Sequence, residues 1–190
     1  MKKIFYFILC VFLLNCSKKE VLQKFENGNV EYECKTALFS KKDCTKYFAN
    51  GKVQEKTHYK KEKLDGERIK YSPNGNVEEI DNYKKGKLEG KSVKYNKEGN
   101  IISKNNFKND ELDGEEILYF DNGKIQEKSI YKNNKKNGKV FVYYENGNVK
   151  EIIPYKNGKL QGEYKKYDED KKLTNILIFD DDSLISSQNF

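Results

Sequence analysis

The chain has 190 residues, of which 35% are charged, and its formal net charge is +7. The aromatic content argues for an ordered chain despite this polarity, because disordered chains are poor in aromatic residues. Phe and Tyr make up 13% of the sequence, which has no Trp. The positive charge favours contact with anionic lipid headgroups, polyanionic glycans or acidic proteins. A solvated, lysine-rich surface explains the same charge without a partner.

Residues 1–15 predict a cleaved signal helix of a bacterial lipoprotein. A short basic start precedes an unbroken apolar run from Ile4 to Leu14, which is too short to span a bilayer as a stable helix but suits a secretory signal. The tetrapeptide Leu-Leu-Asn-Cys that ends at Cys16 resembles the lipobox, whose cysteine is acylated and becomes the new N-terminus. Asn15 stands where Gly, Ala or Ser is usual. An ordinary signal peptide or an uncleaved anchor is the alternative.

Lipidation at Cys16 would place the mature chain in the bacterial cell envelope, anchored to a membrane. By resemblance to sorting in bacteria with two membranes, Ser17 directly after the cysteine points to the outer membrane. We expect no nucleic-acid partner for an exported chain of this kind.

Residues 16–46 are expected to contain the anchor, a linker and an irregular first repeat that caps the array. Cys34 and Cys44 are an even pair in a chain expected to be exported, so they predict a disulfide, with two reduced buried thiols as the alternative. A covalent bond here would stabilise a terminal repeat that lacks one neighbour. The cysteine and histidine spacing suggests no metal site.

Residues 47–179 form a repeat array. An aromatic residue recurs every 12 positions without exception, and glycines recur every 24 positions in two phases that begin at Gly51 and Gly66. A fixed period in this range is the signature of a repeat protein. The aromatic positions form a structural ladder that consists of Tyr47, Tyr59, Tyr71, Tyr83, Tyr95, Phe107, Tyr119, Tyr131, Tyr143, Tyr155, Tyr167 and Phe179.

Each 24-residue repeat predicts one β-hairpin, so the predicted fold class is all-β, an elongated antiparallel meander of hairpins. In the first repeat, alternating segments at residues 52–60 and 67–71 are separated by Lys-Leu-Asp-Gly and followed by Pro-Asn-Gly, which are turn signals. The recurring apolar residues, such as Val53, Tyr59 and Ile69, have odd numbers. If every turn preserves this parity, all twelve aromatics lie on one face of the sheet.

The even-numbered face is expected to be polar in the early repeats and more apolar in the later ones. A patch of this kind marks an interaction site, and the alternative is that the tail, residues 173–190, folds back over it. Residues 180–190 are expected to form a C-terminal cap, and an uncovered sheet could also self-associate. The candidate binding surface consists of Leu118, Ile130, Val140, Val142, Ile152 and Tyr164.

The chemistry-bearing residues argue against an enzyme, a cofactor and a dedicated metal site. His58 is the only histidine, and we expect it on the solvent side beside lysines, which leaves no Ser/His/Asp or Cys/His constellation. A glutamate row is expected to pair with cross-strand lysines or tyrosine hydroxyls, because identity across repeats is what a structural ladder requires. This row consists of Glu55, Glu79, Glu127 and Glu151.

The repeat resembles a known family. The pattern Tyr-x-x-Asn-Gly-Lys from Tyr47, followed by Tyr59-Lys60 and by Leu-Asp-Gly-Glu at residues 64–67, is similar to the variant MORN repeat (membrane occupation and recognition nexus). Bacterial members are often labelled YwqK-family antitoxins. The resemblance covers residues 47 to about 179 and implies an elongated β-hairpin array that serves as a binding or spacer module.

The expected function is a non-enzymatic, lipid-anchored binding module or scaffold for a protein, glycan or membrane partner. The antitoxin label implies the alternative, an immunity protein that neutralises a toxin. The lipobox discriminates between the two, because a secreted and anchored chain cannot easily neutralise a toxin in the cytoplasm.

Overall fold

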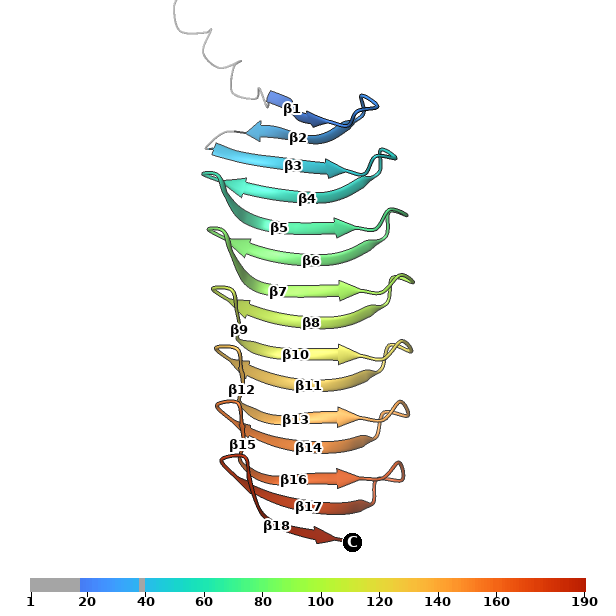
Figure 1. Ribbon diagram of the computed structural model, residues 1–190, viewed down its shortest axis with the longest axis vertical. Helices are drawn as coiled ribbons and strands as arrows, with labels where there is room; N and C mark the ends of the chain where they lie inside the picture. The colour runs from blue at the N-terminus through green and yellow to red at the C-terminus, as the bar shows by residue number, and fades with distance from the viewer. Residues whose placement is uncertain (1–17, 38–39) are drawn as a thin grey trace, which may run out of the picture.

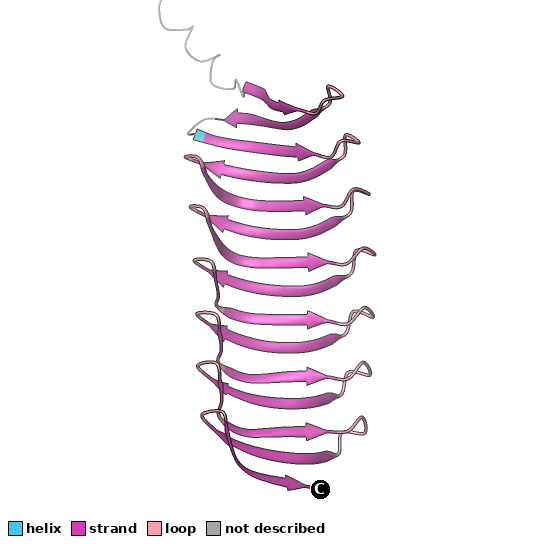
Figure 2. Cartoon of the chain, viewed as in Figure 1, coloured by secondary structure: helices cyan, strands magenta, loops and turns pink. Residues whose placement is uncertain are grey.

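The computed structural model describes residues 18–37 and 40–190; residues 1–17 and 38–39 lie outside the described part. Within it, 18 strands form one open antiparallel sheet, and helical geometry is confined to Ser40 (Figures 1 and 2). The predicted all-β meander of hairpins is confirmed. The predicted signal helix and Cys16 fall outside the described residues.

Successive strands are neighbours in the sheet, so that the chain runs steadily from one end of a long stack to the other (Figure 1). Strands β9, β12 and β15 are short pieces beside a turn that continue, after a break, as β10, β13 and β16. The strands are β1 (Lys18–Lys24), β2 (Val30–Ala37), β3 (Lys41–Tyr47), β4 (Val53–Lys60), β5 (Lys63–Tyr71), β6 (Val77–Lys84), β7 (Lys87–Tyr95), β8 (Ile101–Lys108), β9 (Glu111–Leu112), β10 (Gly114–Tyr119), β11 (Ile125–Lys132), β12 (Lys135–Lys136), β13 (Gly138–Tyr143), β14 (Val149–Lys156), β15 (Lys159–Leu160), β16 (Gly162–Tyr167), β17 (Leu173–Asp180) and β18 (Ser183–Asn189).

One long rim of the sheet, here called the Asn-Gly rim, consists of the predicted glycine loops. In the loop at residues 72–76, Gly75 has a φ of +97° and its N–H donates a 2.8 Å hydrogen bond to the carbonyl of Ser72. Asparagine side chains connect successive loops: Asn76 Nδ2 donates to the carbonyl of Lys97 at 3.2 Å, and Asn148 Nδ2 to that of Glu169 at 2.7 Å. The polar residues of this rim therefore hold the array together.

The opposite rim, here called the turn rim, consists of two-residue turns. Asn133 and Asn134, for example, have φ values of 49° and 62°, and positive φ at both central residues defines a type I′ hairpin turn. The turns lie at residues 60–63, 84–87, 108–111, 132–135, 156–159 and 180–183. The three successive aspartates at residues 180–182 thus contribute to a turn of the same kind.

The predicted turn at Lys-Leu-Asp-Gly is wrong, because the chain already reverses at Lys61 and Glu62. Gly66 lies inside β5, where its φ is +128° and an added Cβ would come within 2.9 Å of the His58 Cβ. This glycine is required by a close approach between neighbouring strands and by a left-handed backbone, which an L side chain adopts at a cost.

The aromatic ladder is divided between the two faces of the sheet. Each Asn-Gly hairpin carries a one-residue bulge: Lys70 pairs with Glu79, but Tyr71 pairs with Val77, which leaves Glu78 without a partner. A bulge of this kind changes the odd–even parity between strands, so the expectation that all the aromatics share one face is wrong. The Tyr59 face carries Tyr59, Tyr83, Phe107, Tyr131, Tyr155 and Phe179, and the Tyr71 face carries Tyr47, Tyr71, Tyr95, Tyr119, Tyr143 and Tyr167.

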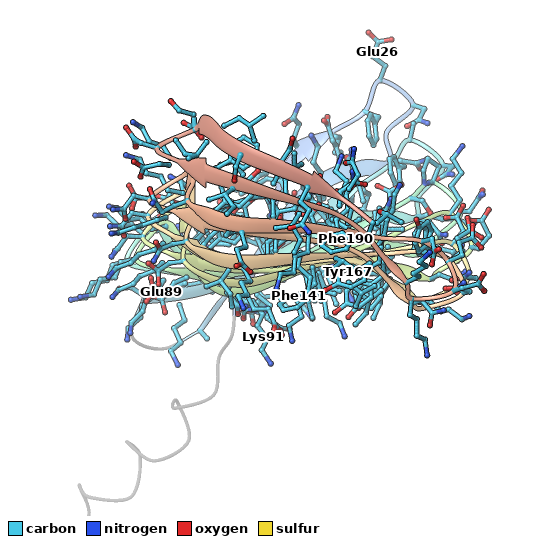
Figure 3. All side chains as sticks on the ribbon, turned by 90° about the horizontal axis from the view of Figure 1, so that it is seen from below. Glu26, Glu89, Lys91, Phe141, Tyr167 and Phe190 are labelled. Atoms are coloured by element: carbon cyan, nitrogen blue, oxygen red, sulfur yellow. A yellow bond between two sulfur atoms is a disulfide. The ribbon has the colours of Figure 1, made fainter. Side chains whose placement is uncertain are left out.

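Side-chain contacts agree with this division. The Lys56 ammonium lies 5.8 Å from the centre of the Tyr71 ring, whereas the Arg68 guanidinium lies 5.2 Å from that of Tyr83. In the end-on view of Figure 3, Lys91 and Phe141, which belong to the Tyr71 face, lie on the lower side of the sheet.

The most buried side chains form one line along the middle of the Tyr59 face, here called the central row. The sheet is a single layer, so few residues are fully enclosed, and these belong mostly to this row. Its members from β2 to β11, here called its first half, are polar apart from the two cysteines, and its four members from β13 to β17, its second half, are apolar or aromatic. Across the strands the central row reads Cys34, Cys44, Thr57, Arg68, Asp81, Ser92, Asn105, Glu116, Ser129, Val140, Ile153, Tyr164 and Leu177.

The C-terminal segment extends the sheet instead of covering it. Strands β17 and β18 pair with each other, with Ile176 opposite Gln188, and β17 pairs with β16. The alternative in which residues 173–190 fold back over one face is therefore wrong.

Candidate functional site

The six residues of the candidate binding surface do not form one patch. The bulges place Leu118, Val140, Val142 and Tyr164 on the Tyr59 face, and Ile130 and Ile152 on the Tyr71 face. Val140 is only 1% exposed, because it belongs to the central row, whereas Ile130 is 43% exposed. The expected single apolar patch is wrong, and Val140 has a packing role.

An ion-pair cluster occupies the first half of the central row. Asp81 is 2% exposed and accepts a hydrogen bond from Arg68, the only arginine of the chain. Beside it, a carboxylate oxygen of Glu79 lies 2.8 Å from Lys70 Nζ, and the other lies 3.5 Å from Lys94 Nζ. Burial raises the pKa of Glu79, but the hydrogen bond from Lys70 and the neighbouring positive charges outweigh burial and lower it. The predicted pairing of this glutamate with cross-strand lysines is confirmed.

One residue breaks the repeat where the second half of the central row begins. Lys136 occupies a position that is leucine elsewhere, namely Leu64, Leu88, Leu112, Leu160 and Leu184. Its Nζ lies 2.6 Å from a carboxylate oxygen of Glu127, and 6.0 Å and 5.7 Å from the ring centres of Tyr131 and Tyr155. The side chain is thus held between two aromatic rings and one carboxylate.

Lys136, Glu127, Tyr131 and Tyr155 are here called the Lys136 cluster, and hydrogen bonds fix the charges within it. Burial raises the pKa of Glu127, but the hydrogen bonds from Lys136 and from the Ser129 hydroxyl outweigh burial and lower it. Burial, together with the nearby Glu116 carboxylate, raises the pKa of Tyr131 to about 12. The Tyr131 ring is therefore a neutral contact surface at physiological pH, and Glu127 is occupied by its two donors.

The Lys136 cluster opens into a shallow hollow on the turn rim, here called the Lys136 hollow. Tyrosine rings, amide groups and lysines together form its walls, which suits a polar ligand with an apolar face. The lining residues are Tyr131, Asn134, Lys135, Lys136, Tyr155, Asn157, Gly158 and Lys159. Sequence reasoning missed this site, although the replacement of a periodic leucine by Lys136 was a visible signal.

A second hollow lies on the same rim around His58. As expected from the sequence, His58 is solvent exposed; its Nδ1 lies 2.6 Å from an Asp43 carboxylate oxygen. The hollow is lined by Lys41, Asp43, His58, Tyr59, Lys60, Asp65 and Gly66. Residues 18–37 and 40–190 contain no group of three or more His, Cys, Asp or Glu side chains placed to hold a metal ion.

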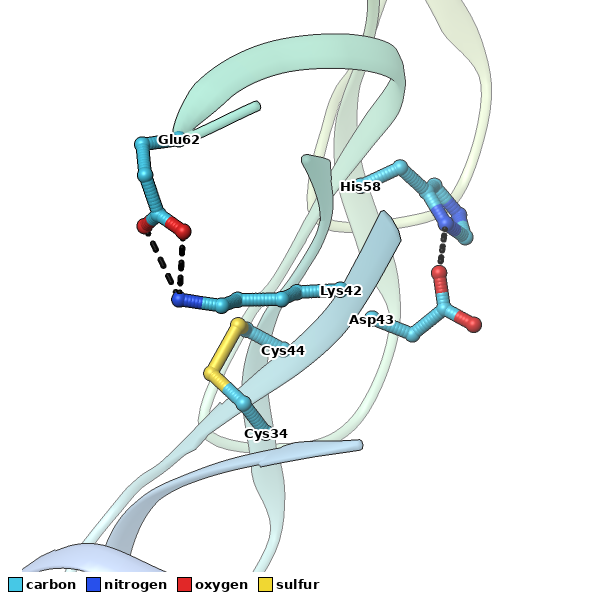
Figure 4. Close-up of a disulfide and its surroundings, with 6 residues drawn as sticks. All are labelled: Cys34, Lys42, Asp43, Cys44, His58 and Glu62. Carbon is cyan, nitrogen blue, oxygen red and sulfur yellow. Dashed lines mark hydrogen bonds and ion pairs between the residues drawn. A yellow bond between two sulfur atoms is a disulfide. The ribbon is translucent and has the colours of Figure 1, made fainter. Parts of the chain in front are cut away.

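The irregular N-terminal repeat is closed by a disulfide. Cys34 and Cys44 are directly opposite each other in β2 and β3, with their Cα atoms 4.1 Å apart, and their sulfur atoms are bonded (Figure 4). Both residues are buried and begin the central row. An ion pair between Lys42 and Glu62, 2.7 Å long, lies beside the bond. This arrangement ties the first repeat to the array.

Comparison with protein families accounts for the repeat. None of the described residues forms a helix that is long and apolar enough to cross a bilayer. A comparison with curated proteins found no match for the chain. The family described as MORN repeat variant matches residues 43–61, 64–85, 88–109, 112–133, 136–157 and 160–181, which together make up more than half of the chain. Each match from residue 64 onward covers the two strands of one hairpin and ends inside the turn that follows it. The chain therefore belongs to the family of MORN repeat variants.

Proposed function

We propose that this protein is a non-enzymatic, lipid-anchored binding module of the bacterial cell envelope. The observation that carries the proposal is the single-layer sheet, in which side chains on both faces and both rims are accessible to a partner. In a repeat array each unit contacts only its neighbours, so the units stack into an elongated structure. Such structures are used as extended binding surfaces. Membership of the MORN repeat variants supports a binding module.

The distribution of reactive groups supports a binding role over catalysis. His58 is exposed and lies beside the Asp43 carboxylate, and the carboxylates of Glu79, Asp81 and Glu127 are engaged by lysine or arginine. A general base requires a free lone pair at the reacting atom. These carboxylates instead stabilise the sheet.

The lipid anchor rests on the Leu-Leu-Asn-Cys motif and on where the sheet begins. Strand β1 starts at Lys18, two residues after Cys16, and its first residue lies on the turn rim. An acyl chain on Cys16 would therefore attach the array to the membrane at one end.

Membrane fractionation of the expressed protein tests the anchor. We expect the wild-type chain in the membrane fraction after a high-salt wash, and Cys16→Ser in the soluble fraction. Cys10→Ser is the matched control, since it removes a cysteine from the same segment but not the acylated one, and it should stay in the membrane. Retention of Cys16→Ser would contradict anchoring through this residue. Wild-type protein found in the cytoplasm would favour the immunity function instead.

A further inference from the structure

The two rims of the sheet differ in charge. The first five turns of the turn rim, residues 60–63, 84–87, 108–111, 132–135 and 156–159, carry eleven lysines and three acidic residues, all solvent exposed. The five facing loops of the Asn-Gly rim, residues 48–52, 72–76, 96–100, 120–124 and 144–148, carry three lysines and three acidic residues. In Figure 3 the side chains of the turn rim project outward on the side where Glu89 is labelled. The positive charge of the array is concentrated on this rim.

Most of the turn-rim lysines have no acidic partner. Within residues 18–37 and 40–190, only Lys159 of the eleven forms an ion pair, with Asp181 at 2.7 Å. Successive turns stack in a column, two strands apart (Figure 1), which corresponds to a spacing of about 9.5 Å. Four of the five turns carry a net positive charge, and the turn at residues 108–111 carries one lysine and two acidic residues. A row of positive charges with this spacing complements a linear polymer that carries anionic groups at regular intervals.

The Lys136 hollow offers aromatic and amide contacts that a polyanion without sugar rings would not make. Tyr131 and Tyr155 present ring faces on the same rim as the lysines, and Asn134 and Asn157 place amide groups between them. Asn134 is held in position because its Oδ1 accepts a 2.7 Å hydrogen bond from the Leu112 N–H. Aromatic faces pack against the C–H face of a sugar ring, and amides bind its hydroxyl groups.

We propose that the turn rim binds a linear acidic polysaccharide. The anionic groups of the polymer lie along the lysines of successive turns, and a sugar ring packs in the hollow that Tyr131, Lys136 and Tyr155 line. The proposal rests on the proposed function, since it names the partner of a binding module. It predicts that the Asn-Gly rim takes no part in binding.

The test uses the full-length chain in mild detergent and measures its affinity for heparin, an acidic polysaccharide. The rim variant is Lys132→Gln/Lys135→Gln/Lys156→Gln, and the matched control is Lys52→Gln/Lys97→Gln/Lys124→Gln. Each removes three positive charges from exposed positions, but from opposite rims. We expect the rim variant to lose at least tenfold in affinity at physiological salt and the control to lose less than twofold. Equal losses, or no loss in either variant, would overturn the proposal.

A second comparison separates sugar recognition from charge. The affinity for inorganic polyphosphate of matched charge is measured first on the wild-type chain and then on Tyr155→Leu. We expect heparin to bind several-fold more tightly than polyphosphate, and Tyr155→Leu to remove that advantage. Polyphosphate binding as tight as heparin binding would assign the rim to polyanions in general and overturn the polysaccharide assignment.

Failure of this inference is distinguishable from failure of the proposed function. A chain that fractionates with membranes through Cys16 but binds no heparin remains a candidate anchored binding module with a different partner. If the wild-type chain binds heparin through the turn rim but is found in the soluble fraction, the polysaccharide site is supported and the lipid anchor is contradicted.

Discussion

The two halves of the array share one backbone pattern but are stabilised by different chemistry. In the first half the central row contains the ion pair between Arg68 and Asp81, whereas in the second half it contains Val140, Ile153 and Leu177. The turns, loops and bulges are the same in both halves. The periodic glycines and aromatics therefore determine the architecture, and the central row is free to differ from repeat to repeat.

Because of this difference, the two halves should respond differently to acid and to substitutions. A buried ion pair is costly to break because one charge is left without its partner. The neighbouring Glu79 carboxylate, whose pKa is lowered in the folded chain, loses its contribution to stability when it is protonated. An apolar row depends on the volume that its side chains fill. Acid and single charge removals should therefore affect the first half, and cavity-forming changes should affect the second half.

The largest effect is expected from Asp81→Ala, which leaves the half-buried Arg68 with only the more distant Glu79 carboxylate, 3.5 Å away. We expect a loss of about 3 kcal/mol in the free energy of unfolding, measured by urea denaturation. Glu78→Ala removes a carboxylate from the exposed bulge of the same strand and should cost less than about 0.5 kcal/mol. Near-normal stability of Asp81→Ala would contradict a structural role for the pair, and Arg68→Leu/Asp81→Leu should recover most of the loss.

The next largest effect should come from the disulfide. Cys34→Ala/Cys44→Ala removes a bond that closes a loop with a sequence separation of 10, which corresponds to about 2.5 kcal/mol. Because repeats contact only their neighbours, the loss should appear as faster amide exchange in β1–β3. Exchange that accelerates equally in β13–β17 would show that the two halves unfold as one unit.

In the second half, Val140→Ala should cost about 2 kcal/mol, because Val140 is fully buried between β11 and β14. Val149→Ala, a half-exposed position on β14, is the control and should cost less than about 1 kcal/mol. Thermal or urea denaturation measures both. An equal cost for the two substitutions would contradict the assignment of Val140 to an enclosed row.

The smallest effect is the pH dependence of the carboxylates. The pKa values of Glu79 and Glu127 are lowered from 4.5 in the folded chain, so their contribution to stability is present above that pH and is lost as the pH falls below it. Glu79→Gln should remove about 1 kcal/mol at pH 7 and weaken the pH dependence. An unchanged acid midpoint in Glu79→Gln would contradict this contribution.

The repeat period was sufficient to predict the hairpins, the Asn-Gly loops and the all-β sheet, because glycine and asparagine that recur at a fixed spacing mark turns with positive φ. The face of each aromatic was not predictable in the same way, since the bulge at Glu78 depends on pairing across strands and not on the residue type. The turn at Lys61 and Glu62 was hidden for a similar reason, because neither residue is typical of positive φ.

The candidate site was only partly visible in the sequence. Lys136 was detectable as a break in a leucine series, but its place between two tyrosine rings requires the cross-strand register. The apolar even-numbered residues were correctly found to concentrate in the later repeats. Their separation onto two faces follows from the bulges.

Amide hydrogen exchange at pH 7 and pH 4, corrected for the intrinsic effect of pH, tests most directly whether one continuous sheet has two chemically different halves. We expect protection along β3 to β17 at pH 7. At pH 4, protection should fall first in β5–β7, around Glu79, and in β11 and β12, around Glu127, and persist in β13–β17. Uniform loss along all strands, or earliest loss in β13–β17, would contradict this description.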